Sequence, residues 1–414
     1  MSLLLTVTGR DHPGVTAALF DVLAAHDVEV GDVEQVVVHD RLLLGVVLAG
    51  PGDGQDLRRA LTDRAAQLDV DVEFTPLDGD EHPAPGVRHH VTVLGHPLDP
   101  AAFAGVARRL AGCGANIERV LRLSRYPLAA YDLLVSGGET SALRAALAAE
   151  AVQQSVDIAV EPATLWRRAR RLVVLDVDST LVQGEVIEML AARAGCEAQV
   201  AEVTRQAMEG ELDFEASLRA RVTLLAGLPV EAVDAVRAAV RLAPGARTLV
   251  RTLKRLGYAV GIVSGGFTAV TADLVRDLGL DHALANELEV VDGRLTGRVL
   301  GRVVDRARKA EALREFAAAE GLSMAQTVAI GDGANDLDML AAAGLGIAFN
   351  AKPVVREAAD AALSVPYLDA VLFLLGVPRD EVEAADAADP AADGQAPGLP
   401  VPSASLRAAV PRPG

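Results

Sequence analysis

Cysteine is scarce in this chain of 414 residues, which has only Cys113 and Cys196. Two cysteines so far apart cannot build a disulfide scaffold, so we expect a reducing compartment, the cytoplasm. Long apolar runs are also missing, because no stretch approaches the roughly 20 residues of a membrane span. The start MSLLLTVTGRDHPG has a short apolar run, but neither the basic leader nor the small-residue cleavage site of a secretory signal. The sequence therefore predicts a soluble cytoplasmic protein without a membrane partner.

Positive charge is scarce as well. The chain has 39 lysine and arginine residues against 57 aspartate and glutamate residues, a formal net charge of −18 at pH 7, and only three of the basic residues are lysines. Such an acidic chain is not expected to bind nucleic acid or an anionic membrane, although a local positive site can still hold a small phosphate. The hydrophobic fraction of 51% is ample for packed cores, and the length suggests about three domains.

The first part of the chain contains a repeated pattern. Residues 1–77 alternate apolar strands and amphipathic helices in the ferredoxin-like order βαββαβ, residues 78–86 form a Pro-, Gly- and acid-rich linker, and residues 87–162 repeat the order. In GRDHPGVTAALFDVLAAHDVEV the first copy resembles the ACT domain family, small modules that usually bind amino acids or mediate pairing. The second copy, GHPLDPAAFAGVARRLAGCGANI, has lost the turn glycine and is a degenerate version.

Residues 172–377 have the pattern of an α/β domain. The runs LVVL, AVGIV, TVAI and LGIAF alternate with helical stretches, which predicts a doubly wound parallel sheet with helices on both faces. Residues 185–243 hold too many helical segments for one crossover and are interpreted as a helical cap. The segment LEVVDGRLTGRV predicts a β-hairpin. Residues 378–414 are rich in Ala, Pro, Gly and Asp, so we expect a disordered tail.

Two carboxylates follow the first strand of this domain. In LVVLDVDST, Asp176 and Asp178 can point the same way from an extended turn, so that one can attack a substrate while the other shuttles protons. A solvated turn would also explain a bare Asp-x-Asp. The preceding apolar strand and the following Ser-Thr favour a functional site, because ligands bind beyond the carboxyl ends of parallel strands.

Three further motifs follow in order. GIVSGGF places Ser264 and Gly265 where a hydroxyl and free backbone amides suit a phosphate oxygen. Lys309 lies at the start of a predicted helix in a chain with few lysines. Its compact ammonium group suits one phosphoryl oxygen, and the alternative is a solvated surface lysine. TVAIGDGANDLDML offers Asp332 and Asn335, whose hard oxygen ligands suit Mg²⁺. A turn followed by a helix cap would explain either residue singly, but not the four motifs together.

These motifs resemble those of the haloacid dehalogenase superfamily of phosphotransferases, over roughly residues 172–377. The resemblance implies that Asp176 attacks phosphorus to form an aspartyl-phosphate and that Asp178 is its acid/base partner. It also implies that Asp176, the backbone carbonyl of Asp178 and Asp332 hold Mg²⁺. In this scheme Mg²⁺ and Lys309 offset the negative charge of the phosphate and the carboxylates.

The predicted cap carries a pair of opposite charges. Glu185 follows the nucleophile in STLVQGEVIEML, and DFEASLRARV places Phe214 and Arg221 on one helical face. These residues resemble the phosphoserine phosphatase family, in which the matching glutamate holds the substrate ammonium and the arginine its carboxylate. The alternatives are a helix N-terminal acid for Glu185 and a solvated helix face for Arg221. Phe214 is assigned to cap packing.

Three supporting residues complete the expected site. Asn335 resembles the family asparagine near the substrate phosphate, Asp336 is expected to organise Lys309 or the metal shell, and Thr180 to orient the loop. The ACT-like modules suggest feedback by an amino acid and a homo-oligomer, a dimer. Two other hypotheses stay open: a phosphatase or phosphotransferase for another small phosphomonoester, and an amino-acid sensor whose phosphatase-like domain is not catalytic.

Overall fold

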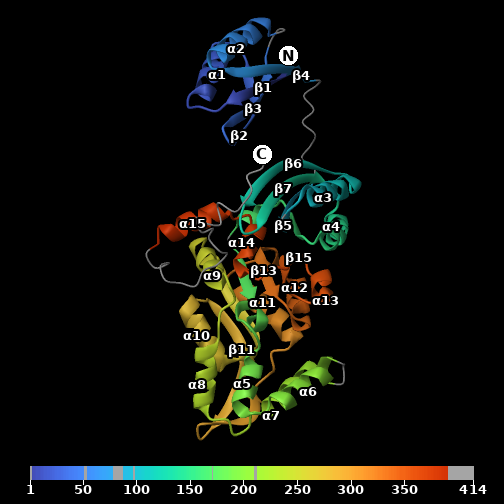
Figure 1. The fold of residues 1–414 in the computed structure, drawn as a ribbon, viewed down its shortest axis with the longest axis vertical. Coiled ribbons are helices and arrows are strands. Elements are labelled where there is room, and N and C mark those ends of the chain that lie inside the picture. Colours follow the sequence, from blue (N-terminus) through green and yellow to red (C-terminus); the bar gives the residue numbers. More distant parts are fainter. Residues whose placement is uncertain are drawn as a thin grey trace. The chain divides into compact units, whose positions relative to one another are not determined.

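The computed structural model of the chain describes residues 2–50, 54–77, 87–96, 98–169, 171–208 and 212–389. The chain forms two compact units, residues 1–85 and residues 86–414, and each is described by itself. Figure 1 shows the elements coloured in chain order. None of the helices in the described ranges is long and apolar enough to cross a membrane.

The first unit is a four-stranded antiparallel sheet with two helices packed on one face. Its elements are β1 (Ser2–Arg10), α1 (Val15–Ala24), β2 (Glu29–Val38), β3 (Arg41–Ala49), α2 (Gln55–Gln67) and β4 (Val70–Pro76). The spatial order is β2-β3-β1-β4. Alternate residues of β1 and β3 are buried, because they share one apolar core with α1 and α2. Strand β2 is an edge strand and is exposed along its length.

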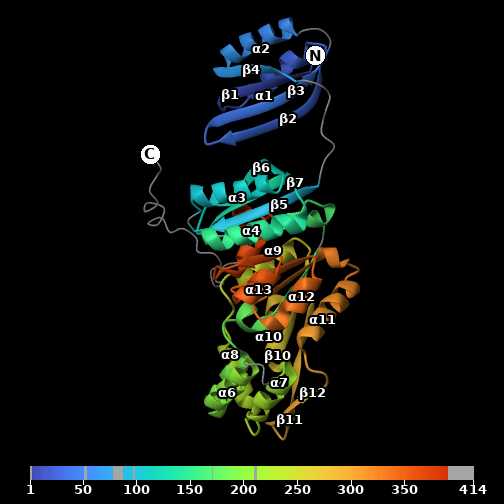
Figure 2. The same cartoon turned by 90° about the vertical axis from the view of Figure 1, so that its right-hand side faces the viewer.

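The second unit begins with a second copy of this fold. Its elements are β5 (Arg88–Gly95), α3 (Pro100–Gly112), β6 (Ala115–Ser124), β7 (Ala129–Gly137), α4 (Thr140–Gln154) and β8 (Asp157–Pro162). The order β8-β5-β7-β6 repeats the order β4-β1-β3-β2 of the first unit, so the predicted duplication of the fold is confirmed. In Figure 2, α3 and α4 lie along the same face of this sheet. A 3₁₀ turn, Leu165–Arg168, connects the module to the rest of the chain.

The sheet of this second module continues into the sheet of the large C-terminal domain. The large domain contributes β9 (Leu172–Leu175), β10 (Ala259–Phe267), β11 (His282–Val291), β12 (Arg294–Leu300), β13 (Thr327–Gly331), β14 (Leu345–Phe349) and β15 (Ala361–Leu363). Their order is β12-β11-β10-β9-β13-β14-β15, and β15 pairs antiparallel with β8 where Ala361 meets Ala159. All neighbours from β11 to β15 are parallel, as predicted, and β11 and β12 form the predicted antiparallel hairpin.

Helices cover both faces of this sheet, and four of them form the predicted cap. The cap helices are α5 (Val186–Ala194), α6 (Glu197–Met208), α7 (Phe214–Thr223) and α8 (Val230–Ala239). The remaining helices are α9 (Ala246–Arg255), α10 (Thr268–Leu278), α11 (Arg306–Ala319), α12 (Leu337–Ala342), α13 (Pro353–Ala358), α14 (Val371–Leu374) and α15 (Arg379–Ala387), with short 3₁₀ turns at Met324–Gln326, Ala334–Asp336 and Leu368–Ala370. The predicted α/β fold class with a cap insert is therefore confirmed.

The cap has a core of its own, which the β11–β12 hairpin completes. Buried side chains of α5, α7 and α8 share one cluster with Phe267, Leu295 and Val299. An antiparallel bridge between Val182 and Leu242 closes the base of the insert. The cap is thus anchored at its base and supported from the side, and its helices cover the edge of the sheet that carries the predicted motifs.

One prediction is wrong in part. The chain was expected to be disordered from residue 378, yet residues 379–387 form helix α15. The composition indicated too little apolar surface, but Val382 is buried and Asp386 accepts hydrogen bonds from Arg251 at 3.0 Å and from Arg255 at 2.5 Å. Ionic contacts with the basic face of α9 therefore hold a helix whose own sequence is poor in apolar residues. Residues 390–414 of the predicted tail, and the predicted linker 78–86, lie outside the described residues.

Candidate active site

The four predicted motifs meet because their strands are neighbours. Strand β9 lies between β10 and β13, and all three run in the same direction. Asp176 follows the last residue of β9, Ser264 lies where the pairing of β10 ends, and Asp332 follows the last residue of β13. The carboxyl ends of parallel neighbours share one edge of a sheet, and this edge therefore gathers the three loops.

Lys309 completes the site from α11. Asp305 caps this helix by accepting from the backbone N–H of Arg308 at 2.7 Å. The side chain of Lys309 is fully buried, and its Nζ donates to Oδ1 of Asp176 and Oδ1 of Asp336, each at 2.7 Å. Burial alone would lower the pKa of Lys309, but the two carboxylates raise it instead. The lysine is therefore a permanent positive charge beneath the pocket.

Asp176 is buried in a site with an excess of negative charge. Only 4% of the residue is exposed, and its backbone N–H donates to the carbonyl of Ile330 at 2.8 Å. Burial and the charge of Asp336 raise the pKa of Asp176 well above its ordinary value, although Lys309 opposes the shift. One ammonium does not balance the carboxylates gathered here, so the site favours binding a further cation.

Three carboxylates could hold that cation. Oxygen atoms of Asp176, Asp332 and Asp336 lie within 4.8 Å of one another. Both oxygens of Asp336 are already engaged, one by Lys309 and the other by the backbone N–H of Gly333 at 3.0 Å. Asp332 accepts from Thr180 Oγ1 at 2.8 Å, and burial raises its pKa to about 6. Asp176 and Asp332 are therefore the better ligands, and Asp336 orients the lysine.

Asp178 joins the sheet edge to the cap. Its Oδ1 accepts from the backbone N–H of Val186, the first residue of α5, at 2.9 Å. Burial, followed by the negative charge of Glu185, raises the pKa of Asp178 to about 6. A carboxyl group with such a pKa exchanges protons near neutral pH, which suits general acid and base catalysis.

The Ser264 turn approaches Asp178 so closely that only glycine fits next to it. The Ser264 hydroxyl is buried and accepts from the backbone N–H of Gly266 at 2.8 Å. A Cβ atom at Gly266 would stand 2.8 Å from Oδ2 of Asp178. Asn286 holds this turn by donating to the carbonyl of Gly265 and accepting from the backbone N–H of Val304, both at 2.8 Å. The sequence analysis missed Asn286, which has no local signal because its strand, HALANELEVV, contains other polar residues.

The cap contributes three side chains to the same place. Glu185 precedes α5, and its carboxylate accepts from the Ser179 hydroxyl at 3.1 Å. Arg221 lies on α7, where burial lowers its pKa against the opposing charges of Glu185 and Asp178. In the described part of the chain no carboxylate is within ion-pair distance of Arg221, whose Nε donates only a long 3.4 Å bond to the Ser217 carbonyl. Phe214 covers the turn, since a Cβ at Gly265 would lie 3.2 Å from its ring.

One cavity of about 930 Å³ connects these groups. Seven of the nine predicted site residues line it: Asp176, Asp178, Glu185, Arg221, Gly265, Asp332 and Asn335. The other two, Ser264 and Lys309, are buried beneath its floor. The lining also includes residues that the sequence analysis did not select, among them Glu188, Asn350 and Lys352.

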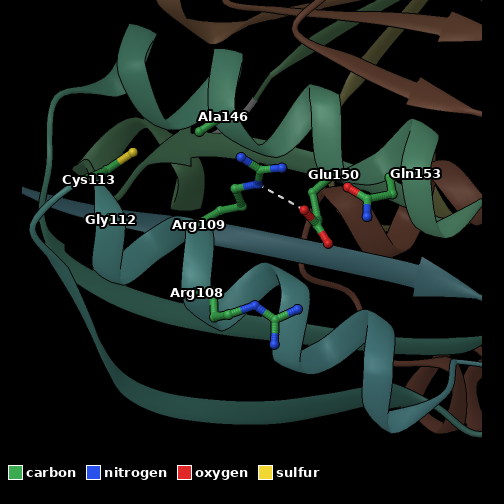
Figure 3. A pocket seen from close by; sticks show the side chains of 7 residues that line it. All are labelled: Arg108, Arg109, Gly112, Cys113, Ala146, Glu150 and Gln153. Atoms are coloured by element: carbon green, nitrogen blue, oxygen red, sulfur yellow. Dashed lines mark hydrogen bonds and ion pairs between the residues drawn. The ribbon is translucent and has the colours of Figure 1, made fainter.

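A second hollow lies between α3 and α4 of the second module. Figure 3 shows Arg109 reaching from α3 to Glu150 on α4, with a bond of 2.8 Å between Nε and Oε2. Gln154 donates to the other oxygen of Glu150 at 2.9 Å. The buried carboxylate is fully satisfied within the module, so this hollow has the features of helix packing and not of a catalytic site.

The comparisons with known proteins agree with this geometry. The family model for haloacid dehalogenase-like hydrolases matches residues 173–341, and two ACT domain models match residues 1–75 and 87–161. A phosphoserine phosphatase of Streptomyces coelicolor is 60% identical over 96% of this chain and 98% of its own length. Phosphoserine phosphatase SerB2 of Mycobacterium tuberculosis is 54% identical over 94% of this chain and 96% of its own length.

A solved structure extends the similarity to the arrangement in space. A probable phosphoserine phosphatase from Vibrio cholerae, in its unliganded form, shares 37% identity with a TM-score of 0.55, covering 72% of this chain and 88% of that one. The high identity over nearly the whole chain, the matched ACT and hydrolase models, and the meeting of all four motifs at one sheet edge lead to the same assignment. This chain belongs to the phosphoserine phosphatase family.

Proposed function

We propose that the chain hydrolyses O-phospho-L-serine to L-serine and inorganic phosphate, the last step of serine formation, through an aspartyl-phosphate on Asp176. One observation carries this proposal. Asp176, Asp178 and Lys309 lie at the sheet edge beneath a cap that presents Glu185 and Arg221 to the same cavity. Such an arrangement serves a phosphate at one end and an amino-acid head group at the other.

The two aspartates divide the chemistry. Asp176 attacks phosphorus, the bond from phosphorus to the serine oxygen breaks, and Asp178 in its protonated form gives its proton to that oxygen. Asp178 then takes a proton from the water that attacks the aspartyl-phosphate, which releases inorganic phosphate and restores both carboxyl groups. The raised pKa of Asp178, about 6, allows it to serve in both steps.

Mg²⁺ is the cofactor that the donor set fits. Asp176, Asp332 and the backbone carbonyl of Asp178 would hold it, since Mg²⁺ prefers hard oxygen ligands and usually takes only one or two carboxylates. When bound, Mg²⁺ supplies positive charge that lets an anion approach a phosphate dianion. Chelation should therefore abolish turnover, and added Mg²⁺ should restore it.

The remaining groups bind the substrate. Lys309, Ser264, Gly265 and Asn335 surround the place of the phosphate, and the buried lysine neutralises one of its oxygens. Glu185 receives the ammonium group. Arg221 receives the carboxylate, because its guanidinium is partly desolvated and the described chain offers it no acid partner.

The ACT-like modules support a regulatory and assembly role. ACT domains often bind amino acids, and we propose an amino-acid effector, serine being the first candidate, and a homodimer. Strand β2 supports pairing, since it is an exposed edge with Val33, Val36 and Val38 open to solvent. If removal of residues 1–85, which form a compact unit of their own, left serine inhibition and the oligomeric state measured by light scattering unchanged, this role would be wrong.

The rival functions predict a different pocket. An enzyme for sugar phosphates has no reason to place Glu185 and Arg221 above the phosphate site, and a non-catalytic sensor has no reason to keep Lys309 buried between two carboxylates. Phosphate release from O-phospho-L-serine and from sugar phosphates, measured with Mg²⁺, separates these cases. Equal rates on both substrates would contradict the substrate assignment.

Two substitutions test the residue roles. Asp176→Asn should abolish turnover, and surviving activity would exclude the aspartyl-phosphate. The control is Asp338→Asn, which changes a surface carboxylate paired with Arg306.

Arg221→Ala should raise KM for O-phosphoserine about tenfold or more, while the KM for p-nitrophenyl phosphate, which has no carboxylate, should rise much less. Arg219→Ala on the same helix is the matched control, because Arg219 pairs with Glu215.

A further inference from the structure

The catalytic cavity contains a cation that the mechanism above does not use. Lys352 lines the cavity beside Asn350 and is exposed to solvent. The other two lysines of the chain are paired, Lys254 with Asp281 and Lys309 with Asp176 and Asp336. No carboxylate in the described ranges lies within ion-pair distance of the Lys352 ammonium. Its charge is therefore available to a ligand.

Lys352 comes from the sheet side of the cavity and not from the cap. It follows β14, which pairs with β13 so that Ala348 lies opposite Gly331, the residue before Asp332. The backbone of this segment is fixed, since Asn350 donates from its N–H to the Leu363 carbonyl at 2.8 Å and from its side chain to the Val365 carbonyl at 3.2 Å. A firmly held loop thus carries a free ammonium next to the Asp332 loop.

The charge of the lining explains why such a cation matters. Five carboxylates line the cavity, from Asp176, Asp178, Glu185, Glu188 and Asp332. The cationic side chains of the described lining are only Arg221 and Lys352, since Lys309 is buried beneath the floor. An entering phosphate dianion therefore meets a mainly negative wall in a protein whose formal net charge is −18 at pH 7. A positive group at the wall lowers this barrier to entry.

We propose that Lys352 is a further substrate-binding residue, which attracts the phosphate group of the ester and contacts it at the wall of the cavity. This inference rests on the proposed function for the identity of the ester. Arg221 serves the carboxylate from the cap side, and Lys352 serves the phosphate from the sheet side. The lysine takes no part in bond breaking, so its effect belongs to capture of the substrate and not to turnover of the bound complex.

The test compares full-length Lys352→Gln and Lys352→Arg with the wild type and with Lys254→Gln, whose lysine is paired elsewhere. We expect Lys352→Gln to lower kcat/KM about five- to tenfold for both O-phosphoserine and p-nitrophenyl phosphate, with kcat within about twofold of wild type. Lys352→Arg should keep most of the activity. Added salt should reduce kcat/KM less in Lys352→Gln than in the wild type, because screening removes an attraction that this variant lacks.

Each other outcome contradicts the inference in a defined way. A Lys352→Gln enzyme that behaves like Lys254→Gln excludes any role in capture, and a loss confined to O-phosphoserine excludes the phosphate as the group contacted. A wild-type chain inactive on O-phosphoserine would refute the proposed function alone. Lys352 is then judged by calorimetric titration with inorganic phosphate, where Lys352→Gln should bind about fivefold more weakly and equal affinity would refute its role.

Discussion

The two ACT-like modules have the same strand order but differ in what lies on the second face of the sheet. In β1 of the first module, buried residues alternate with more accessible ones, so one face packs on the helices and the other is open. In β5 of the second module, five consecutive residues from Val91 to Gly95 are buried. The helices bury one face of β5, and the large domain covers the other. One fold therefore serves as a self-contained unit in one copy and as part of a larger core in the other.

Apolar packing and strand pairing join the second module to the large domain. Five of its buried side chains belong to the cluster that also contains the buried residues of α14: Leu94, Leu123, Leu128, Ala130 and Ala159. Two polar contacts flank β15, where Arg144 pairs with Asp360 and Asp157 accepts from the backbone N–H of Ser364 at 2.7 Å. These contacts fix the segment that follows α13, so the second module supports the side of the sheet that carries Lys352.

Equivalent positions of the two modules show the difference residue by residue. The buried residues Leu57 and Leu61 of α2 correspond to Leu143 and Leu147 of α4. In this alignment of the two helices, Arg58 and Arg144 occupy equivalent positions. Arg58 stays within its own module, with its guanidinium 5.6 Å from the centre of the Phe74 ring. Arg144 donates to the Val160 carbonyl at 3.2 Å and also reaches Asp360 of the large domain. We therefore expect the first module to be the part that is free to respond to an effector.

The largest expected effect comes from removing the modules. Loss of residues 1–85 should leave a folded enzyme that hydrolyses O-phosphoserine, because it removes one compact unit whose apolar core consists of its own residues. Loss of residues 1–163 should leave an insoluble or inactive chain. It uncovers Val371, Leu372 and Phe373, and side chains of this kind contribute about 1.5–3 kcal/mol each when buried, against a total stability of about 5–15 kcal/mol.

Solubility, thermal unfolding and phosphate release of both truncated chains provide the measurement. The comparison between the modules breaks down if the shorter chain, residues 164–414, unfolds at the same temperature as the chain of residues 86–414. It also breaks down if loss of residues 1–85 alone prevents folding of the remainder.

The next largest effect is a difference in stability between substitutions of the equivalent arginines Arg144 and Arg58. Arg144→Ala should destabilise the catalytic unit by about 1–3 kcal/mol, because it leaves Asp360 partly buried without its cation. Arg58→Ala should lose only a cation–π contact of about 0.5–1 kcal/mol, and that loss falls within the first unit. Catalytic activity during thermal inactivation reports on the large domain alone, which is useful since two units need not unfold together. If both substitutions lowered the midpoint temperature of inactivation equally, the two modules would not differ in how they support the large domain.

The sequence predicted which residues meet at the catalytic edge of the sheet, because residues that follow parallel neighbouring strands lie together at that edge. Asp176, Ser264 and Asp332 each follow an apolar strand, and the carboxyl ends of parallel neighbours lie together wherever they stand in the chain. The place of Lys309 at a helix start and the rarity of lysine left a surface role open for it, and the order of the four motifs with the family resemblance selected it. The cap charges needed the family resemblance, since Glu185 and Arg221 lie on separate helices whose approach no local pattern predicts.

The features that the sequence did not predict depend on contacts between segments far apart in the chain. The strand RHHVTVLG contains the polar residues His89, His90 and Thr92, yet His89 and Thr92 are buried and His90 bonds Asp132 at 2.8 Å. His89 is covered by its own module, where its Nε2 lies 3.0 Å from Thr140 Oγ1. The opposite face of the strand, which carries Leu94, is covered by residues from the other end of the chain, and no local pattern indicates this. For the same reason no sequence motif marks Asn286 or Lys352. Their place beside the catalytic site follows only from the folded arrangement of neighbouring loops.

The smallest expected effect is electrostatic and concerns two equivalent aspartates. Asp71 lies opposite Thr8 in the pairing of β4 with β1, and Asp157 lies opposite Leu94 in the matching pairing of β8 with β5. Asp71 is exposed, whereas burial raises the pKa of Asp157 above its ordinary value near 3.8, against the opposing bonds from Ser364. The folded chain therefore holds the Asp157 proton more tightly than the unfolded chain does.

The sign of the pH dependence follows from this shift. A group whose pKa is raised on folding contributes stability below its unfolded pKa, near 3.8, and that contribution is lost as the pH rises through the folded value. Asp157→Asn carries no such loss and can still accept from Ser364, so its stability relative to wild type should increase from pH 4 to pH 7, by less than about 1 kcal/mol. Asp71→Asn should show no such trend. Urea unfolding of the three proteins at both pH values, followed by circular dichroism, which reports on both units, is the measurement. Parallel trends in Asp71→Asn and Asp157→Asn would mean that the large domain does not change the environment of the second module's sheet.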